Sequence, residues 1–182
     1  IRDKAGTFIG SRMGRPEKAK PRELTGSPHV LFPVGEEGGK LRSMMAAIEN
    51  GHVKADFPIY FCENCKKETI YYICESCGKE TRQFHFCPQC SKNLSTESCP
   101  LHGKARTYHE RNIDIKYYCD SAAKALHQKE LPALVKGVRG TSSVNHIPEH
   151  LGKGILRALL NIHVNKDGTI RYDASETPIT QF

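Results

Sequence analysis

The chain has 182 residues, 38% of them hydrophobic and 26% charged, and its formal net charge at pH 7 is +7. This length allows one medium domain or two small ones. No apolar run approaches the roughly 18 residues of a membrane span, and the first residues do not form a signal peptide, so we expect a soluble, cytoplasmic protein without a membrane partner.

Positive charge is concentrated at the beginning of the chain. The first 22 residues contain seven Lys or Arg and only two Asp or Glu. Glycine and proline interrupt residues 9–22, IGSRMGRPEKAKPR, so this stretch predicts a shaped cationic loop rather than a solvated helix face. Its cations are Arg12, Arg15, Lys18, Lys20 and Arg22. Such a loop favours a polyanion, most often nucleic acid; a basic surface that only aids solubility is the alternative.

Two short elements are predicted between this loop and the cysteines. Residues 28–35, PHVLFPVG, form an apolar run bounded by proline and glycine, which is typical of a buried strand. Residues 40–51, KLRSMMAAIENG, predict a helix with Met44, Ala47 and Ile48 on one face and Gly51 as its end.

Seven of the eight cysteines lie between residues 62 and 99 in metal-ligand spacing. Four knuckles have two residues between their ligands, and Gly78 and Gly103 directly follow two of them, where a backbone without Cβ can bend around a metal. The eight ligands are Cys62, Cys65, Cys74, Cys77, Cys87, Cys90, Cys99 and His102.

Eight ligands make two tetrahedral sites, one with four cysteines and one with three cysteines and a histidine. This donor set suits Zn²⁺ and leaves no open catalytic position, so we predict two structural zinc ions. Pairing of consecutive knuckles needs the shortest chain closures, although interleaved pairing is compatible with the spacing. Disulfides and an iron–sulfur cluster are weaker alternatives. Cys119 stands outside the cluster and is expected to be a small buried residue.

Two helices and a hairpin are predicted after the knuckles. Residues 113–131 predict a helix with Ala122, Ala125 and Leu126 inward, and residues 147–160 predict a second with an apolar face. That face contains Leu151, Ile155 and Leu159. Residues 161–174 predict a hairpin whose loop, NKDG, places Gly168 at positive φ; its apolar side chains, expected in the core, are Ile162, Val164, Ile170 and Tyr172.

Residues 134–143, LVKGVRGTSS, are a second candidate for phosphate or DNA contact. Gly137 and Gly140 would let backbone N–H groups approach an anion, with Lys136 and Arg139 beside them. The spacing differs from that of a nucleotide P-loop, and an ordinary turn is an equally good interpretation.

No paired carboxylates of the kind that hold two catalytic metal ions occur in the sequence, since Asp114, Asp167 and Asp173 are isolated. The chain therefore does not contain a complete catalytic site. Strand patterns before and after the knuckles indicate that the zinc module is an insertion. We predict an α+β fold with segments 1–55 and 111–182 forming the core and residues 56–110 forming a double zinc ribbon.

The motifs DKAGTFIGSRMGRPEKAK, HVLFPVG, VKGVRG, IPEHLGKGILRA and KDGTIRYDASETPIT, together with the row of knuckles, follow one another as in one known family. The chain resembles, over nearly its whole length, the large subunit of archaeal family D DNA polymerase. That subunit is far longer than this chain, and the family's acidic motif, of the form N-A-D-C-D-G-D, is absent here.

The resemblance implies a replicative polymerase whose smaller subunit is a proofreading exonuclease. It implies a core of two double-psi β-barrels, one supplying aspartates for Mg²⁺ and the other basic residues. This chain resembles the basic barrel with its zinc insertion. Arg12, Arg15, Lys18 and Lys20 match the basic motif and are expected to contact phosphate or the primer end. The implied partners are template-primer DNA, dNTP, the remainder of the large subunit and the small subunit.

Two other functions fit the residues alone. A free-standing zinc-ribbon protein could bind nucleic acid without catalysis, or the ribbons could dock a partner subunit. Residues 56–110 contain seven Lys or Arg and seven Asp or Glu, which disfavours a nucleic-acid-binding ribbon and favours a structural or protein-docking one.

Overall fold

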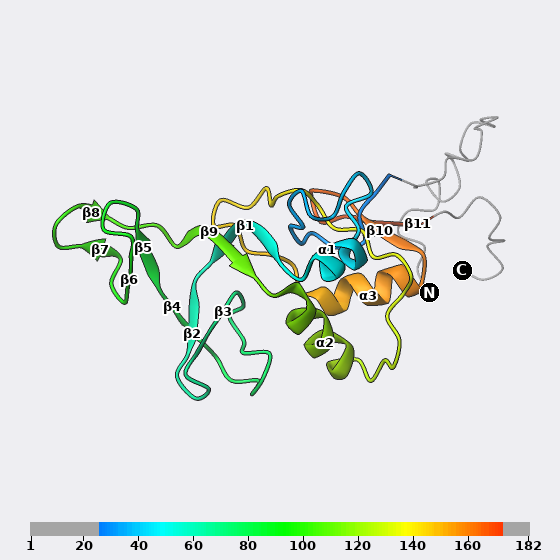
Figure 1. The fold of residues 1–182 in the computed structure, drawn as a ribbon, viewed down its shortest axis with the longest axis horizontal. Helices are drawn as coiled ribbons and strands as arrows, with labels where there is room; N and C mark the ends of the chain where they lie inside the picture. The colour runs from blue at the N-terminus through cyan, green and yellow to red at the C-terminus, as the bar shows by residue number, and fades with distance from the viewer. Residues whose placement is uncertain (1–25, 173–182) are drawn as a thin grey trace, which may run out of the picture. The chain divides into compact units, whose positions relative to one another are not determined.

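The computed structural model describes residues 26–172, so the cationic loop of residues 9–22 and the chain after Tyr172 lie outside the described residues. Three helices pack around one core, α1 (Met44–Asn50), α2 (Ile115–Ala125) and α3 (Leu151–Leu159) (Figure 1). Side chains cap all three at their N-termini. Ser43 Oγ accepts the N–H of Ala46 at α1, and Asp114 Oδ1 accepts the N–H of Tyr117 at α2. At α3, Nδ1 of His150 accepts the N–H of Gly152. Gly51, with φ of 81°, ends α1 as predicted.

Residues 28–35 are extended and buried, but they form a single bridge instead of a regular strand. Val30, Phe32 and Val34 are fully buried, and the segment runs parallel to residues 136–138 through a bridge between Pro33 and Val138. The bridge is bonded through the N–H of Val34 and the carbonyl of Phe32. Earlier in the segment, the N–H groups of His29 and Val30 share the carbonyl of Lys136, so the pairing does not continue as a regular ladder. Residues 136–138 also pair on their other side, because Ser43 bridges to Lys136 in antiparallel fashion.

The knuckles emerge from a two-stranded ribbon. Strand β1 (Val53–Pro58) pairs antiparallel with β9 (Tyr108–Ile113) along its whole length (Figure 1). Between them lie a three-stranded sheet of β2 (Tyr60–Cys62), β3 (Lys67–Thr69) and β4 (Arg82–Gln83), and two hairpins. The hairpins are β5 (His85–Cys87) with β6 (Lys92–Leu94) and β7 (Ser98–Cys99) with β8 (Gly103–Lys104).

The first zinc ribbon is attached to the helical core. Ile70 and Tyr71 directly follow β3 and are buried among residues of α2 and α3. The ring of Tyr71 meets that of Tyr118 edge-on at 5.8 Å, and its hydroxyl donates to the carbonyl of Glu149. This contact holds the ribbon against the core by packing as well as by the chain connections.

The predicted hairpin is present as β10 (Ile162–Val164) and β11 (Ile170–Tyr172), with Gly168 at φ of 83°. Three side chains predicted to face the core are exposed instead: Ala125, Leu159 at 47% and Ile170 at 49%. Helix α2 ends at Ala125, short of the predicted residue 131, and α3 buries Leu151 and Ile155 but turns Leu159 outward. The spacing of apolar residues in the sequence predicted which side of each element is apolar, but it did not show how much of that side is covered by other segments.

Across residues 26–172 the fold combines short helices with sheets of two or three strands, and these residues contain no closed barrel. The α+β prediction is therefore confirmed at this coarser level. Within the same residues, no helix has the length and apolar character needed to cross a lipid bilayer.

Candidate metal centres and charged cavities

All four knuckles share a backbone feature that the sequence shows only in part. The residue after the second ligand has a left-handed backbone in each, at Lys66, Gly78, Ser91 and Gly103, with φ between 53° and 79°. Gly78 and Gly103 were predicted to bend in this way, whereas Lys66 and Ser91 adopt the same conformation with a side chain. In three knuckles, the N–H of this residue donates to the carbonyl of the first ligand: Lys66 to Cys62, Gly78 to Cys74 and Ser91 to Cys87. The turn brings both ligands to one side.

Consecutive knuckles converge into two clusters, as the shortest chain closures favour. Cys62, Cys65, Cys74 and Cys77 form the first cluster, and their sulfur atoms all lie within 4.8 Å of one another. Its Sγ–Sγ distances include 3.5 Å between Cys62 and Cys77 and 3.9 Å between Cys65 and Cys74. A Zn–S bond of about 2.3 Å in a tetrahedron gives an edge of about 3.8 Å, so these sulfurs are spaced for zinc.

The second cluster consists of three cysteines and one histidine. Cys87, Cys90, Cys99 and His102 lie within the same 4.8 Å limit, with His102 presenting Nδ1. That nitrogen is 3.0 Å from the sulfur of Cys90 and 3.7 Å from those of Cys87 and Cys99. Every cysteine of both clusters is a free thiol, with sulfurs too far apart for the roughly 2 Å bond of a disulfide.

The thiols within each cluster have unequal proton affinities. A hydrogen bond with the backbone of Lys79 lowers the pKa of Cys77 to about 7, and one with the backbone of Leu101 lowers that of Cys99 to about 6. Hydrogen bonding with Cys77 raises the pKa of Cys65 to about 12, and with Cys99 raises that of Cys90 to about 11. Several thiolates cannot form this close together unless a cation offsets their charge, and a bound Zn²⁺ would offset it.

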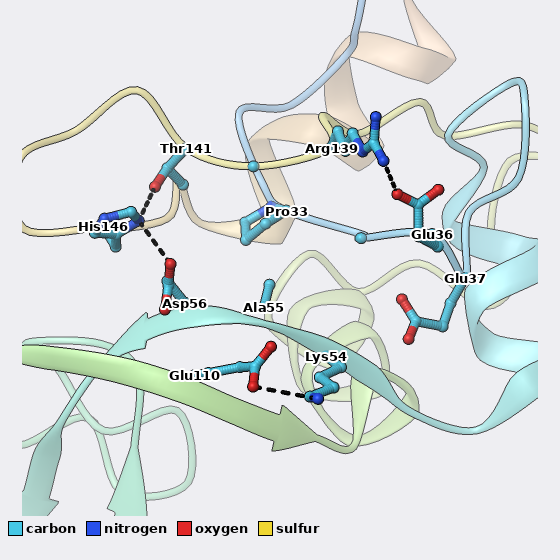
Figure 2. Close-up of a pocket in the computed structure, with 12 residues that line it drawn as sticks. Pro33, Glu36, Glu37, Lys54, Ala55, Asp56, Glu110, Arg139, Thr141 and His146 are labelled. Atoms are coloured by element: carbon cyan, nitrogen blue, oxygen red, sulfur yellow. Dashed lines mark hydrogen bonds and ion pairs between the residues drawn. The ribbon is translucent and has the colours of Figure 1, made fainter. Parts of the chain in front are cut away.

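A cavity of about 370 Å³ lies between the ribbon of β1 and β9 and the residues near Arg139. Figure 2 shows the residues that line it. Arg139 pairs with Glu36, Lys54 Nζ lies 3.2 Å from Glu110, and His146 lies beside Asp56 and Thr141. Glu37 also lines the cavity, and its buried Oε2 has no hydrogen-bond partner among the described residues. Four carboxylates against two permanent cations make this cavity acidic.

An acidic cavity disfavours a phosphate group near Arg139, because neighbouring carboxylates repel it. The predicted DNA contact of Arg139 is not tested by this geometry and stays a prediction. Gly137, predicted to help bind an anion, has a different structural role, since its N–H donates to the carbonyl of Arg42. A Cβ at Gly137 would lie 2.7 Å from the carbonyl oxygen of Phe32, so glycine is required there for close packing.

Lys136 lies on a different surface from Arg139. Its carbonyl accepts the N–H groups of His29 and Val30, and its own N–H donates to Nδ1 of His29. Lys136 lines a second, smaller cavity together with Lys40 and Arg42, two cations that the sequence analysis did not single out. No motif signals them, since they lie in the turn before α1.

Cys119 is 4% exposed within α2, and burial raises the pKa of its thiol to about 12. It is a small buried core residue, as predicted, and a thiol held protonated in this way is a poor nucleophile.

Comparison with known proteins gives the family. Residues 1–96 match the family model described as DNA polymerase II large subunit DP2, central domain, and residues 127–182 match the DP2 catalytic domain. Both models describe parts of a polymerase subunit. The chain belongs to the DNA polymerase II large subunit family, which confirms the resemblance drawn from the motifs.

Full-length relatives agree with this family. The chain is 44% identical to the DNA polymerase II large subunit of Nanoarchaeum equitans and 39% identical to that of Archaeoglobus fulgidus, in each case over all of this chain. That of Methanoculleus marisnigri is 40% identical, again over the whole chain. The chain spans 15–17% of the length of these three relatives.

The segments matched by the two family models fold together. Residues 28–34, within the central-domain match, hydrogen-bond to residues 136–138, within the catalytic-domain match. Arg157 of α3 also donates to the carbonyl of His29, and Leu31 donates its N–H to Glu149. The division between the two models therefore does not separate two independent cores among the described residues.

Proposed function

We propose that this chain contributes to DNA-directed nucleotide incorporation as a segment of a polymerase large subunit. Its place in the family, whose relatives are named DNA polymerase II large subunit, is the observation that carries this proposal. The substrates are template-primer DNA and dNTP, and the chain acts with the remainder of the large subunit and a small exonuclease subunit. A replicative polymerase works on the genome, so we expect it in the cytoplasm, associated with the nucleoid.

The cationic loop is proposed as the catalytic contribution of this chain. Arg12 and Arg15 would bind phosphate oxygens in bidentate fashion, and Lys18 and Lys20 would supply mobile point charges, with Arg22 contacting DNA. Such groups stabilise the negative charge that develops on a transferring phosphate. Mg²⁺ would be held by aspartates elsewhere in the assembled subunit, because the two metal-ligating groups found in residues 26–172 consist of cysteine and histidine.

The core is proposed to be part of a double-psi β-barrel, in which segments 1–55 and 111–182 combine around the inserted ribbons of 56–110. Two observations support this arrangement. The extended residues 28–34 lie parallel to residues 136–138, which come from the far end of the chain. Strands β1 and β9 pair at the two ends of the cysteine-containing segment, as expected for an insertion.

Each cluster is proposed to hold one structural Zn²⁺. The ion would cross-link two knuckles through thiolates and, in the second cluster, through Nδ1 of His102. All four ligands come from the protein, so the metal would stabilise the ribbons without binding substrate. Much of the stability of the ribbons would come from the metal.

The decisive experiment measures primer extension by the assembled polymerase carrying Arg15→Ala or Lys18→Ala in this segment. We expect incorporation to fall by roughly 100-fold or more, as when a group that stabilises transition-state charge is removed, with zinc content unchanged. Lys116→Ala, on the exposed face of α2, is the matched control and should leave incorporation near wild type.

Near-normal incorporation by both variants would refute the catalytic placement of the loop. It would favour the alternative function, in which zinc ribbons bind nucleic acid or dock a subunit without catalysis. The 182-residue chain on its own should not extend a primer, and measurable synthesis would reveal a carboxylate site within it.

A further inference from the structure

Among residues 26–172, those that line one small cavity include three cations and no acid. Lys40, Arg42 and Lys136 line it, together with Gly26, Pro28, Leu41 and Gly137, around a volume of about 120 Å³. The larger cavity of Figure 2 has four carboxylates in its wall. The two cavities therefore attract ligands of opposite charge.

Backbone hydrogen bonds fix the two segments that carry these cations. The N–H of Gly137 donates to the carbonyl of Arg42 at 2.9 Å, and the bridge between Ser43 and Lys136 continues this pairing. On the other side, the N–H of Arg42 donates to the carbonyl of Gly39, which closes the turn before α1. The cationic side chains thus extend from a rigid frame, which lowers the entropic cost of binding a ligand.

Within residues 26–172, no acidic side chain forms an ion pair with Lys40 or Arg42. Both side chains are exposed. The charge of Lys136 is also felt inside the core, where it contributes, after burial and His163, to the lowered pKa of His29. Like charges gathered in this way repel one another and favour a bound anion.

We propose that this cavity binds a single backbone phosphate of DNA, a proposal that rests on the proposed function. Its volume is well below the roughly 300 Å³ at which pockets begin to enclose whole small molecules, so it suits one phosphate of a chain that continues outside. Arg42 offers a bidentate donor and Lys40 adds a point charge, while Lys136 lines the same cavity. Leu41 lies between the first two cations in sequence and is 63% exposed, which provides an apolar contact for a deoxyribose.

The experiment measures binding of the zinc-loaded 182-residue chain to a fluorescent primer-template duplex by anisotropy, between about 50 and 200 mM KCl. The test variant is Lys40→Gln with Arg42→Gln. The control is Lys116→Gln with Lys124→Gln on α2, which removes the same charge from exposed positions that do not line the cavity. Zinc content and circular dichroism establish that each variant is folded.

Each phosphate contact contributes about 0.9 to the slope of log affinity against log salt, which corresponds to roughly eightfold in affinity at about 0.1 M salt. Because the site is proposed to hold one phosphate, we expect the test variant to bind roughly eightfold more weakly and to lose about 0.9 units of slope. The control should change both quantities much less. A test variant that binds like the control would overturn the phosphate site while leaving the proposed function intact.

Two further outcomes separate the remaining possibilities. Pyrophosphate and dNTP are added as competitors, because they share the phosphate chemistry of DNA. Displacement of DNA by millimolar competitor from the wild type, but not from the test variant, would assign the cavity to a free polyphosphate and overturn the DNA assignment. Absence of DNA binding by the wild-type chain even at about 50 mM KCl would reject both this site and the nucleic-acid contact in the proposed function.

Discussion

Replacing Glu149 by Gln tests how the segment around Leu31 is held to helix α3 and the residues just before it. Glu149 accepts two hydrogen bonds of 2.7 Å from the guanidinium of Arg157 and one of 3.0 Å from the N–H of Leu31. The side chains of Glu149 and Arg157 are only 16% and 15% exposed. Glutamine has nearly the same shape but no charge, so the variant leaves a nearly buried guanidinium without its counterion.

The expected loss in free energy of unfolding is about 3 kcal/mol, the size observed when one partner of a mostly buried pair is removed. The matched control is Glu110→Gln, which breaks the pair with Lys54, whose side chains are 63% and 60% exposed; it should cost about 0.5 kcal/mol or less. Both variants are measured by urea unfolding of the zinc-loaded chain at pH 7. Equal losses in the two variants would refute the conclusion that burial makes the Glu149 pair important.

The same pair makes a pH prediction. Burial alone would raise the pKa of Glu149, but the hydrogen bonds from Arg157 and Leu31 outweigh it and lower the pKa below its usual 4.5. The pair therefore contributes its full stability above about pH 4.5 and loses it as the pH falls through the lowered value. Glu149→Gln should flatten this part of the acid unfolding curve relative to wild type.

Three other variants test separate features. Gly154→Ala should destabilise the chain by about 2 kcal/mol in urea unfolding, because the added Cβ would lie 2.6 Å from that of fully buried Val30; Gly140→Ala, with open space around it, should cost far less. Burial lowers the pKa of His29 to about 4 and keeps the ring neutral, so the free energy of unfolding should decrease by roughly 2 kcal/mol as the pH falls from 6.5 toward 4. His29→Asn should remove this part of the pH dependence above pH 5.5. A variant that keeps the full pH dependence in that range would contradict the assignment. Elemental analysis should find two zinc ions per chain and one after Cys99→Ala, whereas a wild-type value near one would exclude two separate sites.

Local patterns were enough to predict the short-range features. The two-residue spacing of the knuckles predicts ligand pairs because one tight turn brings both side chains to the same side, and the structure groups them accordingly. The turn at Gly168 and the helix end at Gly51 were predicted for the same reason, since a positive φ is a property of a few neighbouring residues. The motifs also identified the family, which the comparisons confirm.

Long-range features could not be predicted in this way. Glycine at position 137 suggested an anion site, but its role is to pack against the carbonyl of Phe32, about a hundred residues earlier in the chain. Lys136 and Arg139 looked equivalent in sequence, yet one lies with two other cations and the other is paired with Glu36 in an acidic cavity.

The sequence by itself therefore determined the family, the grouping of the candidate metal ligands and the turns, because each depends on residue identity and short spacing. Only the tertiary structure decided the partner of each charge. A charge acts through its distance to other charges, and those distances are set by packing between segments that are far apart in the chain. The same applies to Leu159 and Ile170, whose apolar character was clear but whose exposure depends on which segments cover them.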